Sequence, residues 1–432
     1  MGKSILVSFF KTYFSNKVFR NTLIYILASG FNAAIPFFIL PVLTAYLTPQ
    51  EYGVVATFMV FNSIFLIAIG VEQYNYVSVN FYSKTPEDIR IYVSNIIMVS
   101  FLIFVFFLII SISLSSYFLT IGGVSIQWIV LSVIVAFFQF LSQLGLTLWQ
   151  LKNEAVRYGL YQVLHSLVNY TLSIFLIAHF GLGESGRILG IMLAAVLFGS
   201  YSIFYIAKQK LIAWNFSFKD IKSSLVYSLP LVPHAFAGWI NTASDRLILN
   251  HYSGVSETGI YAIYYQIAMV ISLVASSFNR AFIPYIFKTL TQGGEEGKRK
   301  LVRYTYYYFG ALLTLSLFLA FATPAILKLL VNEEYHQSER IIYWVIAGFT
   351  ADGLYFGVIN YLFYSKKTAQ VSYITFSSCV IHLVASFLLV PKVGMAGAAY
   401  STAISYIFTF VVAWIVSNRL FPMPWFRTAN IK

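Results

Sequence analysis

Five ionisable side chains lie inside long apolar stretches of the sequence, and they are the residues most able to do chemistry. They are Glu72, Asp245, Arg246, Arg280 and Asp352. A charged group at the centre of a bilayer is unfavourable unless it is paired or hydrated, so each needs a polar environment. Asp352 lies near the middle of its apolar stretch. We therefore expect it to bind a cation or a proton, or to line a wet cavity; a structural acid between helices is the alternative.

Asp245 belongs to a polar stripe that includes His234 and Asn241. Together with Gly238 these residues are spaced by 4, 3 and 4 positions, which places them on one face of a helix. Such a face is expected to line a cavity or a seam between helices. Asp245 is a second candidate for ion coupling, and Asn241 and His234 are candidates for substrate contact. Arg246 follows Asp245 and is rotated from it by about 100° around the helix axis. We expect it to contact substrate; extension to the membrane surface or a structural ion pair is the alternative.

Two further stripes carry amides and a histidine at helical spacing. They contain Gln139 and Gln143 in one apolar stretch, and Gln162, His165 and Asn169 in the next. Amide and imidazole groups can hydrogen-bond the polar groups of a ligand, which makes these residues weaker cavity candidates. Hydrogen bonds between neighbouring helices are the commoner use of such residues, and they remain the alternative.

The elements that must position these residues are membrane-spanning helices. Of the 432 residues 59% are apolar, 19% are aromatic and only 10% are charged, against about 25% charged in soluble domains. About 20 apolar residues are needed to cross a bilayer as a helix. Twelve windows of that kind occur, at about 22–47, 54–78, 91–115, 125–149, 156–180, 188–210, 226–251, 259–283, 304–323, 340–364, 370–391 and 395–417. The sequence therefore predicts an all-α integral membrane protein with about 12 transmembrane helices.

The positive charge of the chain follows the same pattern. Of the 28 Lys and Arg residues, 22 fall in the segments on one side of the twelve windows and 4 on the other. Because cytoplasmic loops are enriched in cations, both termini are predicted to lie in the cytoplasm. The net charge of +13 is thereby explained without a nucleic-acid partner.

Several kinds of chemistry are not supported by the residue types. The single cysteine, Cys379, excludes an internal disulfide, and the six histidines do not pair at helical spacing. A glycine-rich phosphate loop of the G-x-x-x-x-G-K-[ST] type is missing from the sequence. We therefore expect no catalytic residues, metal or cofactor, and no ATP hydrolysis. Any driving force would come from an H⁺ or Na⁺ gradient or from removal of the product.

An internal repeat divides the chain. Tyr46, Glu51, Gly53 and Ala56 recur 206 positions later as Tyr252, Glu257, Gly259 and Ala262. Both sets lie at the hairpin between the first two helices of a six-helix half, which indicates a duplication. The predicted domains are a six-helix lobe at 1–210, an interfacial cytoplasmic linker at 211–225 and a second six-helix lobe at 226–432.

Four segments resemble a known family. They are ILPVLTAYLTPQEYGVVA (39–56), SDRLILNHYSGVSETGIYA (244–262), NRAFIPYIF (279–287) and GMAGAAYSTAISY (394–406). They are similar to the polysaccharide and O-antigen repeat-unit flippases of the Wzx type, in the MOP exporter superfamily. The resemblance implies two MATE-like six-helix lobes around a cavity that opens alternately to each side. It also implies a bacterial inner membrane, an undecaprenyl-pyrophosphate-linked oligosaccharide as substrate, and a downstream polymerase as partner.

Glu72 and Arg280 form a hypothetical gate. Under the 206-residue shift Arg280 corresponds to position 74, so both residues lie near the cytoplasmic ends of equivalent helices. In the fold that the resemblance implies, those helices face each other. The hypothesis is that the pair closes an inner gate, and that freed Arg280 offers its charge to the substrate pyrophosphate. Separate contacts with the membrane surface are the alternative.

Competing functions remain. A multidrug or cation antiporter of the same superfamily would suit Asp245, Asp352 and Glu72, but not Arg246 and Arg280. A lipid II flippase is disfavoured, because that family usually has more spans. A membrane enzyme, either a polymerase or a glycosyltransferase, is the alternative outside the transporters. It is disfavoured because such enzymes usually carry their catalytic groups on a sizeable external loop, and the external loops here are short.

Overall fold

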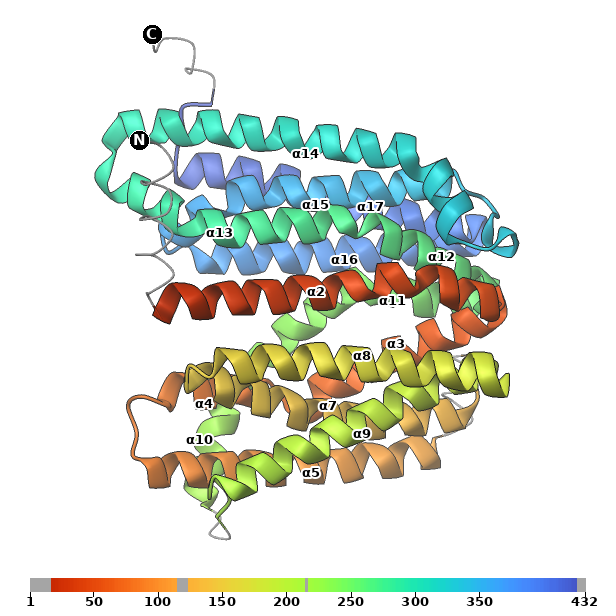
Figure 1. Ribbon diagram of the computed structural model, residues 1–432. Helices are drawn as coiled ribbons and strands as arrows, with labels where there is room; N and C mark the ends of the chain where they lie inside the picture. Colours follow the sequence, from red (N-terminus) through yellow and green to blue (C-terminus); the bar gives the residue numbers. More distant parts are fainter. Residues whose placement is uncertain (1–16, 115–122, 214–216, 426–432) are drawn as a thin grey trace, which may run out of the picture. The chain divides into compact units, whose positions relative to one another are not determined.

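A computed structural model describes residues 17–114, 123–213 and 217–425 (Figure 1). Its regular elements in these ranges are all helices. Eleven stretches are helical, long enough and apolar enough to cross a bilayer. A helix is the economical way to do so, because it satisfies its own backbone hydrogen bonds in hydrocarbon. The predicted all-α membrane fold is confirmed.

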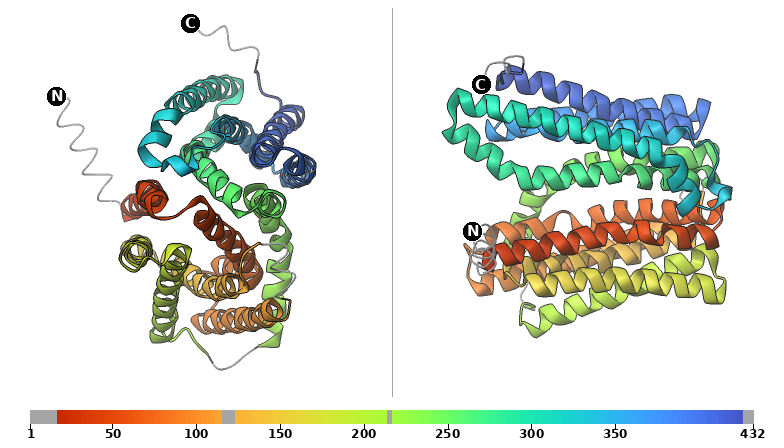
Figure 2. Two further views of the ribbon diagram at one scale, coloured as in Figure 1. Left: turned by 90° about the vertical axis from the view of Figure 1, so that its right-hand side faces the viewer. Right: turned by 45° about the horizontal axis from the view of Figure 1, so that its top comes forward.

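The described residues form two compact units. Unit 1 holds residues 17–47, 61–114, 124–213 and 217–233, and unit 2 holds residues 48–60, 123 and 234–425. The sequence-based domain boundaries did not anticipate that the segment 48–60 packs with the later half of the chain. Figure 2 gives, in its left panel, a view close to the helix axes.

The helices of unit 1 follow the first six windows. Their bounds are α2 (Lys17–Tyr46), the second half of α3 (Pro49–Gly70), α4 (Gln73–Asn80), α5 (Pro86–Ser113), α7 (Ile126–Leu151), α8 (Ala155–Phe180), α9 (Gly183–Lys208), α10 (Phe218–Ser228) and the short η1 (Leu229–Leu231). Within this unit α8 packs against α2 and α9, and α7 packs against α9 and α5. The segment before α10 is tied to α5, since the backbone N–H of Ala213 donates to Ser94 Oγ at 2.6 Å.

The helices of unit 2 follow the last six windows. Their bounds are α11 (Val232–Ser253), α12 (Val255–Ala268), α13 (Val270–Gln292), α14 (Gly294–Leu330), the short η2 (Glu333–Tyr335), α15 (Ile341–Tyr364), α16 (Thr368–Val393) and α17 (Met395–Leu420). Here α17 packs against α15 and α16, and α13 packs against α14 and α15. α11 is not among the eleven apolar spans, because His234, Asn241, Asp245 and Arg246 lower its hydropathy.

Three expected windows are divided between helices. In window 226–251, α11 begins only at Val232, after α10 and η1, and in window 259–283, α12 ends at Ala268 and α13 begins at Val270. The window 54–78 was expected to be a single helix, but α3 ends at Gly70 and α4 begins at Gln73. Val71 and Glu72 between them have φ values of 45° and 52°. This left-handed backbone is unfavourable for a β-branched residue, and it breaks the hydrogen-bond ladder of the helix. Glu72 therefore lies at a corner between two helices, which corrects its expected place inside a continuous span.

α5 shows how local sequence sets a helix end. Thr85 is its N-cap and Pro86 its first residue. Asp88 N–H donates to Thr85 Oγ1 at 3.2 Å, and Thr85 N–H donates to the Asp88 carboxylate at 3.1 Å. This reciprocal capping box satisfies two backbone donors that a helix start leaves unpaired.

The repeat residues Gly53 and Gly259 bring α3 and α12 into backbone contact within unit 2. A Cβ added to Gly53 would lie 1.9 Å from the carbonyl oxygen of Val255, and one added to Gly259 would lie 2.1 Å from that of Pro49. The two contacts are reciprocal, because Pro49 and Val255 are themselves 206 positions apart. Small residues permit such close crossings in membranes. The first half of α3 is held in unit 2 in this way, while its second half belongs to unit 1.

We expect Gly53→Ala to lower the thermal stability of the detergent-solubilised protein. The added methyl group must push two backbones apart, and overpacking of this kind typically costs about 1–3 kcal/mol. Gly310→Ala on α14 is the control, because a Cβ there meets nothing within 4 Å. Equal melting temperatures for the two variants would contradict the close crossing.

Candidate functional site

Unit 1 contains a cavity of about 460 Å³ that is lined by five of its elements. α2 contributes Asn32, α4 contributes Tyr74, and the corner between α3 and α4 contributes Glu72. The remaining lining residues come from α3, α7 and α8: Leu66, Ile67, Gly70, Gln139, Phe140, Ser142, Gln143, Leu146, Tyr161, Gln162 and His165. The size lies within the range of small-ligand sites, which is about 300–1,000 Å³.

The two amide stripes meet in this cavity. Gln139 and Gln143 of α7 line it together with Gln162 and His165 of α8. The Gln162 side chain donates to the Tyr158 hydroxyl at 3.3 Å. Its buried Oε1, and Nε2 of His165, have no hydrogen-bond partner among the described residues. A buried polar atom without a partner is unfavourable, so these atoms are ready to bond a ligand or water.

Glu72 supplies the ionisable group of the cavity. Its carboxylate accepts from the Tyr74 hydroxyl at 2.7 Å and from the Asn75 side-chain amide at 2.8 Å. The Tyr74 phenol is protonated at physiological pH and so remains a donor to this carboxylate. Next to it Gln73 is fully buried, and both polar atoms of its amide have no partner in the described ranges.

Asn169 does not line the cavity. Its side-chain oxygen accepts a hydrogen bond from Arg187 at 2.6 Å, and Ser173 accepts another at 2.6 Å. The Arg187 guanidinium also lies 4.5 Å from the centre of the Tyr170 ring. Asn169 therefore serves a contact between α8 and α9, which is the interhelical alternative. Arg187 is only 7% exposed on α9.

In unit 2, Asp245 is fully buried against α12 and α17. The Tyr261 hydroxyl donates to its carboxylate at 2.5 Å, and the Thr402 hydroxyl donates at 3.4 Å. Its other oxygen accepts from the backbone N–H of Arg246 at 2.8 Å. One turn earlier on the same face, the buried side-chain oxygen of Asn241 has no partner among the described residues. The stripe thus faces a helix seam at Asn241 and Asp245, whereas His234 is exposed.

Arg246 packs against an aromatic ring. Its guanidinium carbon lies 4.4 Å from the centre of the buried Tyr265 ring, which is the geometry of a cation–π contact. For this residue the sequence left open substrate contact, extension to the membrane surface and a structural ion pair. The structure shows the contact with Tyr265 in unit 2, and the role of Arg246 in substrate binding stays a prediction.

Asp352 lies on α15 and is held from α13. The Ser272 hydroxyl donates to its carboxylate at 2.7 Å. A second polar contact joins the same helices, because the Asn360 amide donates to the side-chain oxygen of Asn279 at 2.7 Å. Asp352 and Asp245 are thus two carboxylates held by hydroxyl donors in the interior of one unit.

Glu72 and Arg280 lie in different units, and Arg280 is exposed on α13. Their pairing in a gate stays a prediction. Within the described residues, no group of three or more His, Cys, Asp or Glu side chains could hold a metal ion. In unit 1, the unpartnered amide and imidazole atoms can form hydrogen bonds with a polar ligand. In unit 2, the carboxylates of Asp245 and Asp352 are groups that can accept a proton or a small cation.

Comparisons with known proteins identify the family of this chain. Residues 18–290 match the family model described as polysaccharide biosynthesis protein, and residues 230–388 match the MatE model. A Haemophilus influenzae protein of the Lsg locus is 24% identical over 92% of this chain and 99% of its own length. A Staphylococcus aureus capsular polysaccharide biosynthesis protein, CapF, is 22% identical over 91% of this chain and 98% of its own length.

The fold is also similar to solved structures. The lipid II flippase MurJ, in an inward closed conformation, superimposes with a TM-score of 0.75 at 15% identity, over 91% of this chain and 87% of that one. Because the identity is low, the likeness concerns the fold. It confirms the predicted MOP-like architecture.

We expect Tyr261→Phe to destabilise the protein by about 1–3 kcal/mol, because the buried Asp245 carboxylate loses a short hydrogen bond. Thermal unfolding in detergent measures the change, with Tyr373→Phe, at an exposed position, as the control. Adding Asp245→Asn should cause less than the sum of the two single losses. Additive losses would show that the two side chains are not coupled.

Proposed function

Since this chain belongs to the polysaccharide biosynthesis protein family, we propose that it is a flippase for lipid-linked oligosaccharides. The substrate would be an undecaprenyl-pyrophosphate-linked repeat unit, carried by alternating access to the outer leaflet of a bacterial inner membrane. The product would feed O-antigen, capsule or exopolysaccharide synthesis through a downstream polymerase. In this proposal both termini lie in the cytoplasm, and the chain is a transporter without catalytic activity.

The observation that carries the proposal is the amide-lined cavity of unit 1. Gln139, Gln143, Gln162 and His165 offer both donors and acceptors there. A sugar presents hydroxyl groups that both donate and accept, and it needs such a surface to replace its water. Glu72 adds one carboxylate that can accept from hydroxyls. We assign this cavity to the sugar part of the substrate.

Arg280 is the proposed partner of the pyrophosphate. A guanidinium presents several N–H donors in one plane, which suits the oxygens of a phosphate. Arg280 is exposed on α13, so its charge is not used up in the interior of unit 2. In the gate hypothesis it pairs with Glu72 in one state and with the substrate in the other. Arg246 is a weaker candidate for this role, because it packs on Tyr265.

Asp352 and Asp245 are the proposed ion-coupling residues. Both lie in unit 2 and each receives a hydroxyl hydrogen bond. Such an arrangement can stabilise either a protonated or a metal-bound carboxylate after a small rearrangement. We propose that a proton or Na⁺ taken up here links transport to an ion gradient.

A multidrug or cation antiporter is the second candidate, favoured by the match to the MatE model over residues 230–388. Its cationic substrates would require an acidic site. The carboxylates of unit 2 supply that, but the largely neutral cavity of unit 1 does not. The enzyme alternative has less support, since the similar solved structure is a flippase.

We expect complementation of a deletion strain to separate these functions. In a strain that makes a known surface polysaccharide, loss of the protein should cause lipid-linked repeat units to accumulate on the cytoplasmic leaflet and surface polymer to fall. Gln162→Leu and His165→Leu should restore polymer about three- to tenfold less well than the wild-type protein at limiting expression, as expected for one lost hydrogen bond each. Arg280→Ala should fail to relieve the accumulation.

Gln150→Leu is the matched control for the cavity variants. Gln150 is exposed at the end of α7 and does not line the cavity. It should complement like the wild-type protein. If the deletion leaves polymer unchanged but sensitises cells to cationic dyes, the antiporter function replaces the flippase.

We expect Asp352→Asn to remove the response of transport to an imposed ion gradient. In proteoliposomes, translocation of a short-chain polyprenyl-pyrophosphate-linked sugar is followed with a pH gradient or with a Na⁺ gradient. The wild-type rate should rise with one of the two, and Asp352→Asn and Asp245→Asn should keep only the basal rate. Glu333→Gln, in the exposed η2 turn, is the control. Wild-type acceleration in both carboxylate variants would exclude them as coupling residues.

A further inference from the structure

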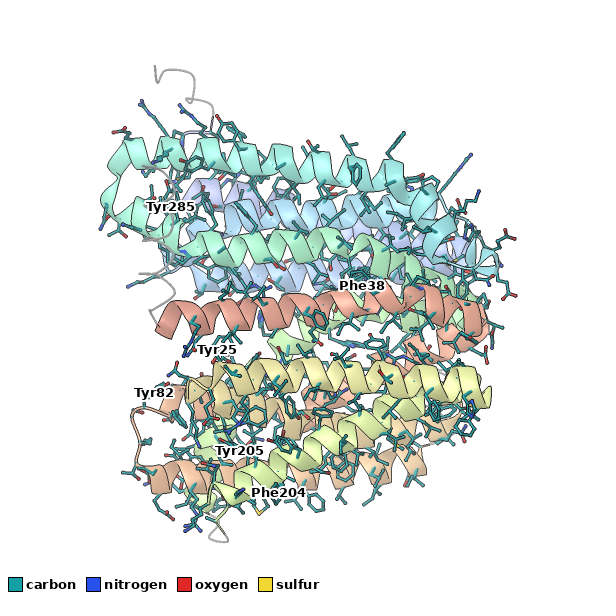
Figure 3. The ribbon with its side chains drawn as sticks, viewed as in Figure 1. Tyr25, Phe38, Tyr82, Phe204, Tyr205 and Tyr285 are labelled. Carbon is teal, nitrogen blue, oxygen red and sulfur yellow. The ribbon has the colours of Figure 1, made fainter. Side chains whose placement is uncertain are left out.

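An aromatic groove of about 940 Å³ runs between α13 and α14 in unit 2. α13 contributes Val274, Phe278, Phe282 and Tyr285 at spacings of 4, 4 and 3, which is one face of that helix. α14 contributes the rest of the lining: Lys300, Tyr304, Tyr307, Tyr308, Ala311, Leu312 and Leu315. Figure 3 shows Tyr285 near the end of α13, close to where α14 begins.

The lining of the groove does not include the polar residues of α13. Ser272 and Asn279 bond to Asp352 and Asn360 of α15. Arg280 is two positions after Phe278, about 200° around the helix. Neither the proposed coupling carboxylate nor the proposed pyrophosphate partner therefore belongs to the groove, and a function of the groove is additional to theirs.

The rings of the groove form a continuous stack. Phe278 lies 4.9 Å from Tyr308 at an interplanar angle of 8°, and 5.2 Å from Phe282 at 27°. Phe282 in turn stacks on Tyr285 at 5.2 Å. Tyr307 beside them is 65% exposed. Stacked aromatic rings therefore line a channel that is open to the surroundings of unit 2.

A single cation lies at one end of this apolar channel. The Lys300 ammonium is 5.9 Å from the centre of the Tyr304 ring, a loose cation–π contact. From Lys300 to Leu315 the groove follows α14 for about 22 Å at a helical rise of about 1.5 Å per residue. That length can run from the headgroup region through one leaflet of a hydrocarbon core of about 30 Å.

Unit 1 offers an apolar groove of similar size for comparison. It lies between α2 and α8, measures about 870 Å³, and has Phe31 as the one aromatic residue in its lining. Its lining residues include no ionisable side chain. Ordinary acyl chains would suffice to fill a groove of that kind. The stacked rings and the terminal lysine distinguish the groove between α13 and α14.

We propose that the groove between α13 and α14 is the first binding site for the polyisoprenoid chain of a prenyl-phosphate lipid, with its phosphate at Lys300 before the pyrophosphate passes to Arg280. An anionic phosphate complements the ammonium, and an unsaturated, branched chain can pack against the aromatic and apolar lining. The inference rests on the proposed function, because it assigns a place to the lipid part of the substrate. It adds a binding site for the chain that is distinct from the sugar cavity.

Photocrosslinking in nanodiscs tests the proposal with the full-length protein. A benzoylphenylalanine replaces Tyr307 in the groove, or Leu160 in the groove between α2 and α8 as the matched control. Polyprenyl monophosphate without sugar is the probe. We expect saturable crosslinking at position 307, displaced by unlabelled polyprenyl phosphate and not by an equal amount of phosphatidylglycerol. Displacement by phosphatidylglycerol, or equal yields at both positions, would identify the groove as a site for bulk phospholipid and overturn the proposal.

Substitutions then separate the two ends of the ligand. Lys300→Gln should weaken polyprenyl phosphate about tenfold, as expected for the loss of one charge-assisted contact, and leave polyprenyl alcohol unchanged. Phe278→Leu should weaken both. Unchanged affinity in both variants, at wild-type melting temperatures, would overturn the proposal. The probe carries no sugar, and the experiment measures its binding without transport. Probe binding can therefore be lost in a protein that still complements the deletion strain, and it can be kept in a protein that does not. Failure of the flippase function is thereby distinguishable from failure of this inference.

Discussion

The close crossing of α3 and α12 is the contact on which the arrangement of the chain depends. Gly53 and Gly259 have no side chains, so each helix places its backbone against the carbonyl of the other. This contact holds the first half of α3 in unit 2. The second half of the same helix supplies Gly70 to the cavity of unit 1, and the chain turns sharply at Glu72 just beyond it. One continuous helix thus connects the packing of unit 2 to the lining of the proposed sugar site.

The two proposed sites use their polar residues in opposite ways. In unit 1, the cavity keeps polar atoms of Gln162 and His165 without partners among the described residues. In unit 2, Asp245 and Asp352 are already bonded to Tyr261 and Ser272. Unpartnered neutral groups suit the transient binding of a large polar ligand, since each bond gained offsets a lost bond to water. Well-bonded carboxylates suit a small ion, since the charge must be stabilised whether or not the ion is bound.

Helical periodicity predicted much of this from the sequence. Regular spacing was enough to place Asn241 and Asp245 on one face, and Gln162 and His165 on another. Periodicity did not predict which side chains contact each other between helices. Spacing along a single helix could not reveal that Arg187 of α9 donates to Asn169 of α8. It also could not reveal that Arg246 of α11 packs on the ring of Tyr265 in α12. The corner at Val71 and Glu72 was not predicted either, because the apolar residues continue along the sequence across the point where the helix breaks. The aromatic groove is formed by residues of both α13 and α14, so the pattern of either helix alone does not predict it.

The shared helix α3 also has a consequence for biogenesis. A ribosome makes residues 48–60 about 200 residues before it makes Val255 and Gly259, the positions against which they pack. Until then the glycine surface of α3 has no native neighbour, and the insertion machinery or lipid must shield it. The first half of the protein therefore cannot complete its native packing in the membrane until the second half has been made. Quality-control proteases would therefore be expected to encounter truncated chains with this surface uncovered.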